Sequence, residues 1–196
     1  HPSAKGVSNE TVRVLNRAIM EAGGPANLLC SIASPTLDSS QALMKHPDVR
    51  LLLVTGGGAV VKLAMTSGKK TVAAGPGNPP VIVDDTAALT NAARSIVDGA
   101  SFDNNVLCIA EKEIFVFENV ADRLKAELAR HGAHEVSGRE RDALVEACLD
   151  LSHPDHPVGN RDLIGKDALE LLAAAGLSGP PDTRLVMCEV DDLQHP

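Results

Sequence analysis

The chain has 196 residues, a net charge of −8 at pH 7 and a hydrophobic content of 44%. This length suits one large domain or two small ones, and the hydrophobic content builds a core without disulfide or metal support. The negative charge argues against sequence-independent binding of nucleic acid, and the longest apolar runs are strand-sized, too short to cross a membrane.

The first 76 residues alternate between helix-like and strand-like patterns. Apolar residues at spacings of three and four predict a helix capped by Ser8, running to Ala22 and ended by two glycines. The following patterns predict strand, helix, strand, helix and strand over residues 28–33, 36–45, 49–54, 59–67 and 71–74. Strand–helix–strand units of this length form parallel sheets, so residues 1–76 are predicted to belong to a doubly wound, Rossmann-like sheet.

Residues 75–80 interrupt this alternation, because two glycines and three prolines in six residues continue neither a helix nor a strand. We expect a hinge or domain junction here. Beyond it the patterns predict strands at 81–83, 114–117 and 184–190, helices at 86–97, 120–131, 139–151 and 168–175, and an exposed loop at 152–161. The sequence therefore predicts an α/β chain with domains at residues 1–76 and 77–196.

The run Thr55-Gly56-Gly57-Gly58 lies between a predicted strand and a predicted helix. Glycines there let the backbone approach a phosphate, and a helix N-terminus offers unpaired N–H groups and the positive end of its dipole. The run does not match the G-x-G-x-x-G fingerprint, so a tight turn without a ligand stays an equal alternative. Three lysines near this turn, Lys62, Lys69 and Lys70, would either contact the bound phosphate or be solvent-exposed surface side chains.

Cys108 follows a polar stretch whose residues Asp103, Asn104 and Asn105 favour turns. Exposed N–H groups nearby would favour the thiolate of a partly exposed cysteine. The alternative is a structural thiol buried ahead of a strand. The other cysteines, at 30, 148 and 188, lie in apolar sequence and are predicted to be buried; no paired spacing is present, which indicates a reduced, intracellular chain.

Two further groups of polar residues are predicted to be structural. The adjacent carboxylates Asp84 and Asp85 are expected to cap the helix that starts near Thr86. Five of the seven histidines could suggest a metal site, but they lack acidic or cysteine partners at metal-binding spacing, so we expect solvated side chains and no metal site; they are His131, His134, His153, His156 and His195.

Two longer runs, residues 101–112 (SFDNNVLCIAEK) and 74–84 (AGPGNPPVIVD), resemble the CoA-acylating aldehyde dehydrogenases. The resemblance is closest to the propionaldehyde and acetaldehyde dehydrogenases of propanediol and ethanolamine microcompartments, and it extends over the whole chain. Members of that family are more than twice as long. The resemblance thus implies an incomplete aldehyde dehydrogenase fold, with the second half of the NAD-binding domain at 1–76 and the first part of the catalytic domain at 77–196.

The resemblance also assigns roles to individual residues. Cys108 is the implied nucleophile. The implied contacts to NAD are Thr55, Gly56 and Gly57 at the pyrophosphate, Val60 against the adenine, His1 and Pro2 at the adenosine ribose, and Gly75 and Gly77 near the nicotinamide. The family's side-chain oxyanion donor and the acidic residue that holds the nicotinamide ribose are expected outside this chain.

Ala74 stands where hydrolytic aldehyde dehydrogenases carry the glutamate that activates water. A thioester on Cys108 is therefore expected to persist until CoA attacks it, so the implied reaction is oxidation of a short-chain aldehyde by NAD and CoA to acyl-CoA. The alternatives are a hydrolytic enzyme that releases the free acid and a non-catalytic nucleotide-binding fragment. The resemblance further implies a homo-oligomer in the cytoplasm or inside a bacterial microcompartment.

Overall fold

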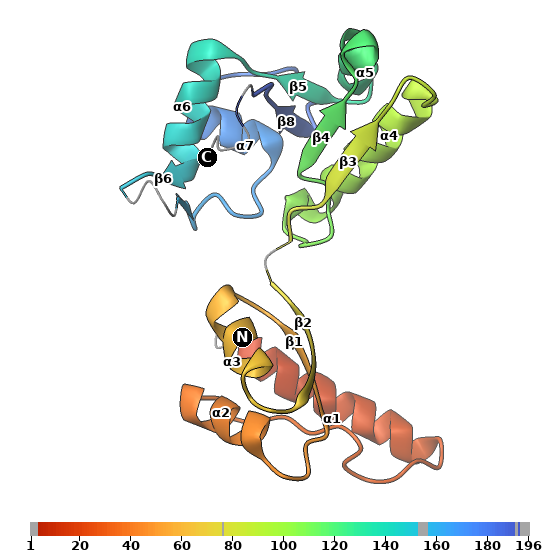
Figure 1. Cartoon of the computed structure of the whole chain (residues 1–196), viewed down its shortest axis with the longest axis vertical. Helices are drawn as coiled ribbons and strands as arrows, with labels where there is room; N and C mark the ends of the chain where they lie inside the picture. The colour runs from red at the N-terminus through yellow and green to blue at the C-terminus, as the bar shows by residue number, and fades with distance from the viewer. Residues whose placement is uncertain (1–3, 76, 153–156, 191, 193–196) are drawn as a thin grey trace. The chain divides into compact units, whose positions relative to one another are not determined.

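The computed structural model describes residues 4–75, 77–152, 157–190 and 192. The chain divides into two compact units, residues 1–76 and 77–196, called here the N-terminal unit and the C-terminal unit (Figure 1). The division falls within the glycine- and proline-rich segment. Assigning the units to a cofactor domain and a catalytic domain remains a prediction.

The N-terminal unit contains one pair of parallel strands joined by a helix. Its elements are α1 (Lys5–Glu21), α2 (Leu37–Lys45), β1 (Leu51–Thr55), α3 (Gly58–Met65) and β2 (Lys70–Ala74). Strand β1 pairs with β2 so that Thr55 lies opposite Ala74 at the carboxyl ends of both strands. Ala64 of α3 and Leu52 of β1 are buried, which shows that α3 covers one face of this pair.

Two local predictions for this unit are wrong. Helix α1 starts at Lys5, so Ser8 lies inside it and does not cap it. Residues 28–33 form bends and irregular backbone, and the predicted strand is absent. The Asn16 side chain of α1 donates to the Leu29 carbonyl at 2.7 Å and accepts from the Leu29 N–H at 3.1 Å. This helix side chain thus supplies both bonds that a neighbouring strand would otherwise give Leu29.

The main core of the C-terminal unit lies between a second parallel strand pair and two helices. These are β3 (Pro80–Val83), α4 (Leu89–Ala100), β4 (Glu113–Val116) and α5 (Glu118–Arg130), with β3 parallel to β4. Apolar residues spaced three or four apart on the two helices meet in this core, which includes Ile96, Val97, Val120, Leu124 and Leu128. Each leucine buried here contributes roughly 1.5–3 kcal/mol.

The rest of this unit is built around a third parallel pair. Strand β5 (Ala133–Glu135) pairs with β8 (Leu185–Met187), and β6 (Leu149–Asp150) pairs antiparallel with β7 (Val158–Gly159). Helices α6 (Gly138–Cys148) and α7 (Ala168–Ala174) lie side by side (Figure 1). The helix predicted over 139–151 therefore ends early, and part of the predicted loop at 152–161 forms a strand.

The turn before α4 explains why this helix starts three residues later than the sequence predicts. The Asp84 carboxylate accepts hydrogen bonds from the Thr86 N–H at 2.9 Å and from the Thr86 hydroxyl at 2.7 Å. These bonds, the side-chain one first, lower the pKa of Asp84. They stabilise a turn, and α4 begins only at Leu89. Asp84 therefore closes the turn that precedes the helix, and the predicted cap near Thr86 is wrong.

The α/β class is confirmed, with parallel strands connected through helices. In the described residues each sheet contains two strands. The structure therefore has separate strand pairs in place of one continuous doubly wound sheet. Large apolar side chains stay exposed on them, with Leu53 of β1 at 79% and Ile82 of β3 at 74%. In the described part of the chain, no helix combines the length and apolar character needed to cross a membrane.

Candidate active site

Cys108 lies on the connection between α4 and β4, residues 101–112, called here the cysteine loop. Its side chain is exposed, whereas Ala110 two residues later is only 5% exposed. The loop therefore anchors itself through one side chain and presents another to solvent. A structural thiol buried ahead of a strand does not fit this position.

Three consecutive residues of the cysteine loop adopt left-handed backbone conformations, with φ of 50° at Asp103, 49° at Asn104 and 59° at Asn105. Asp and Asn tolerate this region better than other residues with a β-carbon. The Asn105 side chain donates to the Ala100 carbonyl at 2.6 Å and to the Glu111 carbonyl at 3.1 Å. One amide thus ties the two ends of the loop together.

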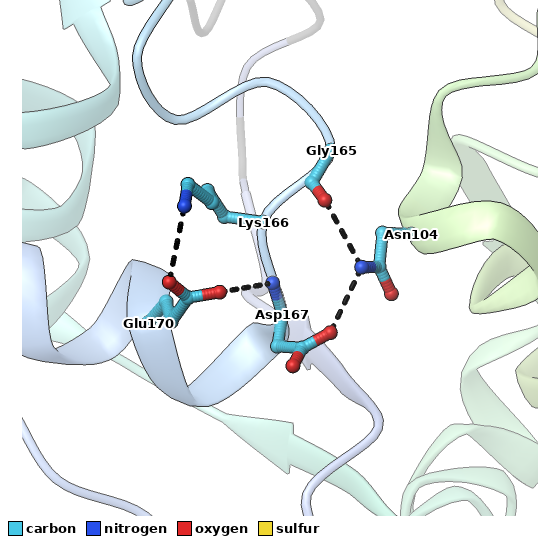
Figure 2. A network of polar contacts seen from close by, with 5 residues as sticks. All are labelled: Asn104, Gly165, Lys166, Asp167 and Glu170. Atoms are coloured by element: carbon cyan, nitrogen blue, oxygen red, sulfur yellow. Dashed lines mark hydrogen bonds and ion pairs between the residues drawn. The ribbon is translucent and has the colours of Figure 1, made fainter.

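Asn104 attaches the cysteine loop to the start of α7 (Figure 2). Its side-chain nitrogen donates to the Gly165 carbonyl at 3.0 Å and to the Asp167 carboxylate at 2.8 Å. Asp167 is the N-cap of α7, and its backbone N–H donates to the Glu170 carboxylate at 3.2 Å in a capping box. Lys166 completes the network through an ion pair with Glu170 at 3.2 Å. A rigid helix start therefore supports the loop.

The ammonium group of Lys112 donates hydrogen bonds to backbone carbonyls of the cysteine loop. Its Nζ lies 3.1 Å from the Leu107 oxygen, 3.2 Å from the Asn105 oxygen and 3.4 Å from the Ala110 oxygen. It also bonds to the side-chain oxygen of Asn105. The acceptors on both sides of Cys108 therefore converge on one cation.

Gly77 approaches the backbone of Cys108 so closely that no side chain fits between them. A β-carbon on Gly77 would lie 2.1 Å from the Cys108 carbonyl oxygen and 3.4 Å from the Cys108 Cβ. A glycine is therefore required at position 77. The structure brings together these two of the predicted site residues, which come from opposite ends of the β3–α4 segment.

In the N-terminal unit, Thr55-Gly56-Gly57-Gly58, called here the glycine turn, connects β1 to α3. The Gly56 N–H donates to the Ala74 carbonyl at 3.2 Å, and Gly57 is the N-cap of α3 without any side-chain cap. β-carbons placed on Gly57 or Gly58 would meet no atom within 4 Å. The helix start thus faces open space, as a site for a phosphate group requires.

The other predicted site residues of this unit lie around the same strand ends. Val60, 40% exposed, is on α3, and a β-carbon on Gly56 would contact it at 3.7 Å. Ala74 ends β2 with an exposed side chain, and Gly75 follows it with open space around its backbone. His1 and Pro2 lie outside the described residues.

The lysines near this mouth differ in their contacts. Lys69 donates to the His46 carbonyl at 2.9 Å, which engages its ammonium within the unit. Lys62 and Lys70 are exposed. These two lysines are therefore solvent-exposed side chains in the structure, which is the second of the two predicted alternatives.

The prediction that the remaining cysteines are buried is wrong. Cys30 and Cys188 are exposed and Cys148 is half-buried. Desolvation by neighbouring atoms still raises the pKa of the Cys148 thiol, and it raises the pKa of the largely exposed Cys188 thiol against the opposing effect of Arg141. At neutral pH both thiols are therefore poorer nucleophiles than an unperturbed cysteine.

Sequence reasoning missed the contacts that hold the cysteine loop. Asn104 and Asp167 are 63 positions apart, and no local pattern connects them. The signals that could have found part of this network are the Asp-Asn-Asn run, which tolerates left-handed backbone, and the Asp-x-x-Glu capping box at 167–170.

Comparison with known proteins shows what kind of protein this arrangement belongs to. The sequence profile of the aldehyde dehydrogenase family matches residues 4–147. An acetylating acetaldehyde dehydrogenase of Bilophila wadsworthia is 45% identical to this chain, covering 100% of the chain and 42% of the relative. The chain therefore belongs to the aldehyde dehydrogenase family, and it spans less than half the length of the relatives that it matches.

Solved structures give the same result at the level of the fold. A propionaldehyde dehydrogenase from the fucose utilisation microcompartment of Clostridium phytofermentans has a TM-score of 0.88 at 38% identity, covering 99% of this chain and 44% of that one. A Rhodopseudomonas palustris propionaldehyde dehydrogenase, solved with bound CoA and an acylated cysteine, has a TM-score of 0.85 at 38% identity, covering 97% and 43%. The predicted resemblance to the acylating branch is confirmed.

Proposed function

We propose that the full-length protein containing this chain is an NAD-dependent, CoA-acylating aldehyde dehydrogenase that converts acetaldehyde or propionaldehyde to the acyl-CoA. The observation that carries the proposal is the exposed Cys108, packed by its backbone against Gly77 and held in a braced loop. The acylated cysteine in a structural relative supports the same chemistry. In this proposal the N-terminal unit is part of the cofactor domain and the C-terminal unit part of the catalytic domain.

Cys108 provides the nucleophile. Its thiolate sulfur adds to the aldehyde carbonyl carbon and forms a tetrahedral adduct whose oxyanion accepts a hydrogen bond from the Cys108 backbone N–H. NAD, when bound, supplies the acceptor for the hydride that leaves this carbon. Collapse of the oxyanion leaves a thioester on Cys108. The thiolate of CoA then attacks the acyl carbon, forms the new thioester and releases the Cys108 thiolate.

The glycine turn fits the pyrophosphate of NAD. Gly56 and Gly57 place no side chain in the open space at the start of α3, and the helix presents its first N–H groups there. Thr55 would add a hydroxyl to the same contact. Val60 would lie against the adenine, His1 and Pro2 at the adenosine ribose, and Gly75 and Gly77 near the nicotinamide.

Ala74 explains why CoA, and not water, would accept the acyl group. Position 74 ends β2 with a methyl side chain, which cannot remove a proton from water. A thiol attacks a thioester without a base of that kind once it is ionised. Placing a carboxylate at this position tests the argument: Ala74→Glu should release some free acid, and the absence of free acid would contradict this account of the acceptor.

Assembly and location belong to the same proposal. The names of relatives connect this branch with bacterial microcompartments, as in the Clostridium phytofermentans protein. We infer a homo-oligomer that works in the cytoplasm or inside such a compartment. The native mass of the full-length protein, and its recovery with purified compartments, would test both statements.

The decisive experiment replaces the nucleophile in the full-length protein. Cys108→Ala should abolish formation of acyl-CoA while NAD affinity stays close to that of the unmodified protein, with Cys30→Ala as the matched control. Retained turnover in Cys108→Ala would refute the proposal. Free acid as the main product would indicate a hydrolytic enzyme, and equally slow labelling of all four thiols by iodoacetamide would indicate a non-catalytic binding protein.

A further inference from the structure

The position of Lys112 inside the cysteine loop has a consequence for the reaction itself. We propose that Lys112 is a positioning residue that aims the backbone N–H of Cys108 at the oxyanion. The inference rests on the proposed function, because it assigns a role within that reaction. The observation behind it is the ammonium group that bonds to the carbonyl oxygens of Asn105, Leu107 and Ala110.

The planarity of the peptide bond connects Lys112 to Cys108. The Leu107 carbonyl and the Cys108 N–H belong to one planar trans peptide unit, so they point in opposite directions. The Leu107 oxygen accepts from Lys112 Nζ at 3.1 Å and from the Ala110 N–H at 3.2 Å. With the carbonyl held on that side, the N–H of Cys108 must point to the other.

This N–H is available for a ligand. Across residues 4–75, 77–152, 157–190 and 192, no hydrogen bond engages the backbone N–H of Cys108. The next peptide is held as well, because Gly77 lies against the Cys108 carbonyl. The main chain on both sides of the nucleophile is thus fixed, and its donor stays free for the oxygen of the substrate.

A second possible role for Lys112 would be to stabilise the Cys108 thiolate through its charge. The geometry favours orientation, because the ammonium donates to carbonyl oxygens that already surround it. The two roles predict different results for the thiol: an orienting residue leaves the pH dependence of Cys108 alkylation unchanged, whereas a residue that stabilises the thiolate shifts that dependence to higher pH when its charge is removed.

The test uses Lys112→Met in the full-length protein, with Lys45→Met as the matched control, since Lys45 is an exposed lysine of α2 in the other unit. For Lys112→Met we expect kcat for acyl-CoA formation to fall by about 10²- to 10³-fold, the loss typical of one oxyanion donor. KM for the aldehyde should change little. The rate of iodoacetamide labelling at Cys108 and its pH profile should match the unmodified protein, because alkylation develops no oxyanion.

Lys112→Arg should recover part of the lost kcat, because the guanidinium keeps several donors for the same carbonyls. If thermal unfolding shows that Lys112→Met does not fold, Lys112→Leu replaces it under the same criteria, since it likewise has no donor for the loop carbonyls. A folded neutral variant with an unchanged kcat would overturn the inference. So would a loss of kcat accompanied by a shifted pH profile of Cys108 labelling.

Cys108→Ala in the same assay separates this inference from the proposed function. If Cys108→Ala still forms acyl-CoA, the proposed function itself fails. If Cys108→Ala is inactive while Lys112→Met and Lys45→Met both keep full activity, only the role of Lys112 fails.

Discussion

The glycine turn and the cysteine loop are both short connections between a strand and a helix, but they are held in different ways. The glycine turn is shaped by the backbone, and β-carbons on Gly57 and Gly58 would meet no neighbour. The cysteine loop is held by side chains, chiefly Asn104, Asn105 and Lys112. A phosphate can be bound by main-chain N–H groups alone, whereas a nucleophile must be oriented by its surroundings. The difference follows from these two tasks.

Among the changes that compare the backbone geometry of these two connections, the largest effect should come from adding a side chain at Gly77. Gly77→Ala would place a methyl group 2.1 Å from the Cys108 carbonyl oxygen, so the cysteine loop must shift. A displacement of about 1 Å at a reacting group costs on the order of 10²-fold in rate. We expect a loss of that size in kcat for acyl-CoA formation in the full-length protein.

The control for this prediction is Gly159→Ala in β7, where a β-carbon meets no atom within 4 Å. Its kcat should match that of the unmodified protein. Full activity in Gly77→Ala would show that the loop adapts, and the proposed contrast with the glycine turn would then be weaker than the structure indicates.

A smaller effect should follow when the anchor to α7 is removed. Asn104→Ala loses the bonds to Gly165 and Asp167 and also places alanine at a φ of 49°. Asn104→Gly loses the same bonds but tolerates this φ. We expect Asn104→Gly to lower stability by about 1–3 kcal/mol, and Asn104→Ala to lower it by about 1 kcal/mol more. Chemical denaturation of both variants measures the difference, and equal stabilities would contradict the left-handed strain.

The glycine turn should respond in the opposite way, through binding and not through stability. Gly57→Val would place a branched side chain in the open space before α3, where its β-carbon meets no atom within 4 Å. We expect NAD affinity to fall by about tenfold or more, equivalent to about 1.4 kcal/mol, while the unfolding temperature hardly changes. Gly6→Ala, which also meets no atom, is the control on α1. Titration with NAD measures the affinity, and an unaltered value would argue against a phosphate site.

The smallest expected effect concerns pH. Thr86 lowers the pKa of Asp84 below its ordinary value of 3.8. The stabilisation from this bond should therefore be complete above pH 3.8 and be lost as the pH falls from there through the lowered pKa. Thr86→Val should flatten the acid limb of unfolding temperature against pH. An identical acid limb in both proteins would show that this exposed turn does not contribute.

The sequence predicted the elements whose signals are local. The crossover from β1 through α3 to β2 follows from short apolar runs separated by a glycine-rich turn. The residues around Cys108 left an exposed and a buried thiol as alternatives, and the structure has the exposed one. Residues 28–33 were predicted wrongly because Asn16, far away in the chain, supplies the hydrogen bonds of Leu29. An apolar run cannot reveal such a partner.

The same limit applies to the candidate site. Cys108 and the glycine turn could be proposed from motifs, and their roles remain predictions. The network that braces the cysteine loop could not, because Asn104 meets Asp167 only when the loop lies against the start of α7. The close approach of Gly77 to Cys108 likewise depends on how β3 leaves the junction, which no spacing in the sequence expresses.

The exposed leucine and isoleucine side chains on the two-stranded sheets have a practical consequence. Leu53 and Ile82 expose apolar surface beside strand edges that can pair with a second copy of the chain. A polypeptide of these 196 residues alone is expected to aggregate during purification. Kinetic work should therefore use the full-length protein proposed above.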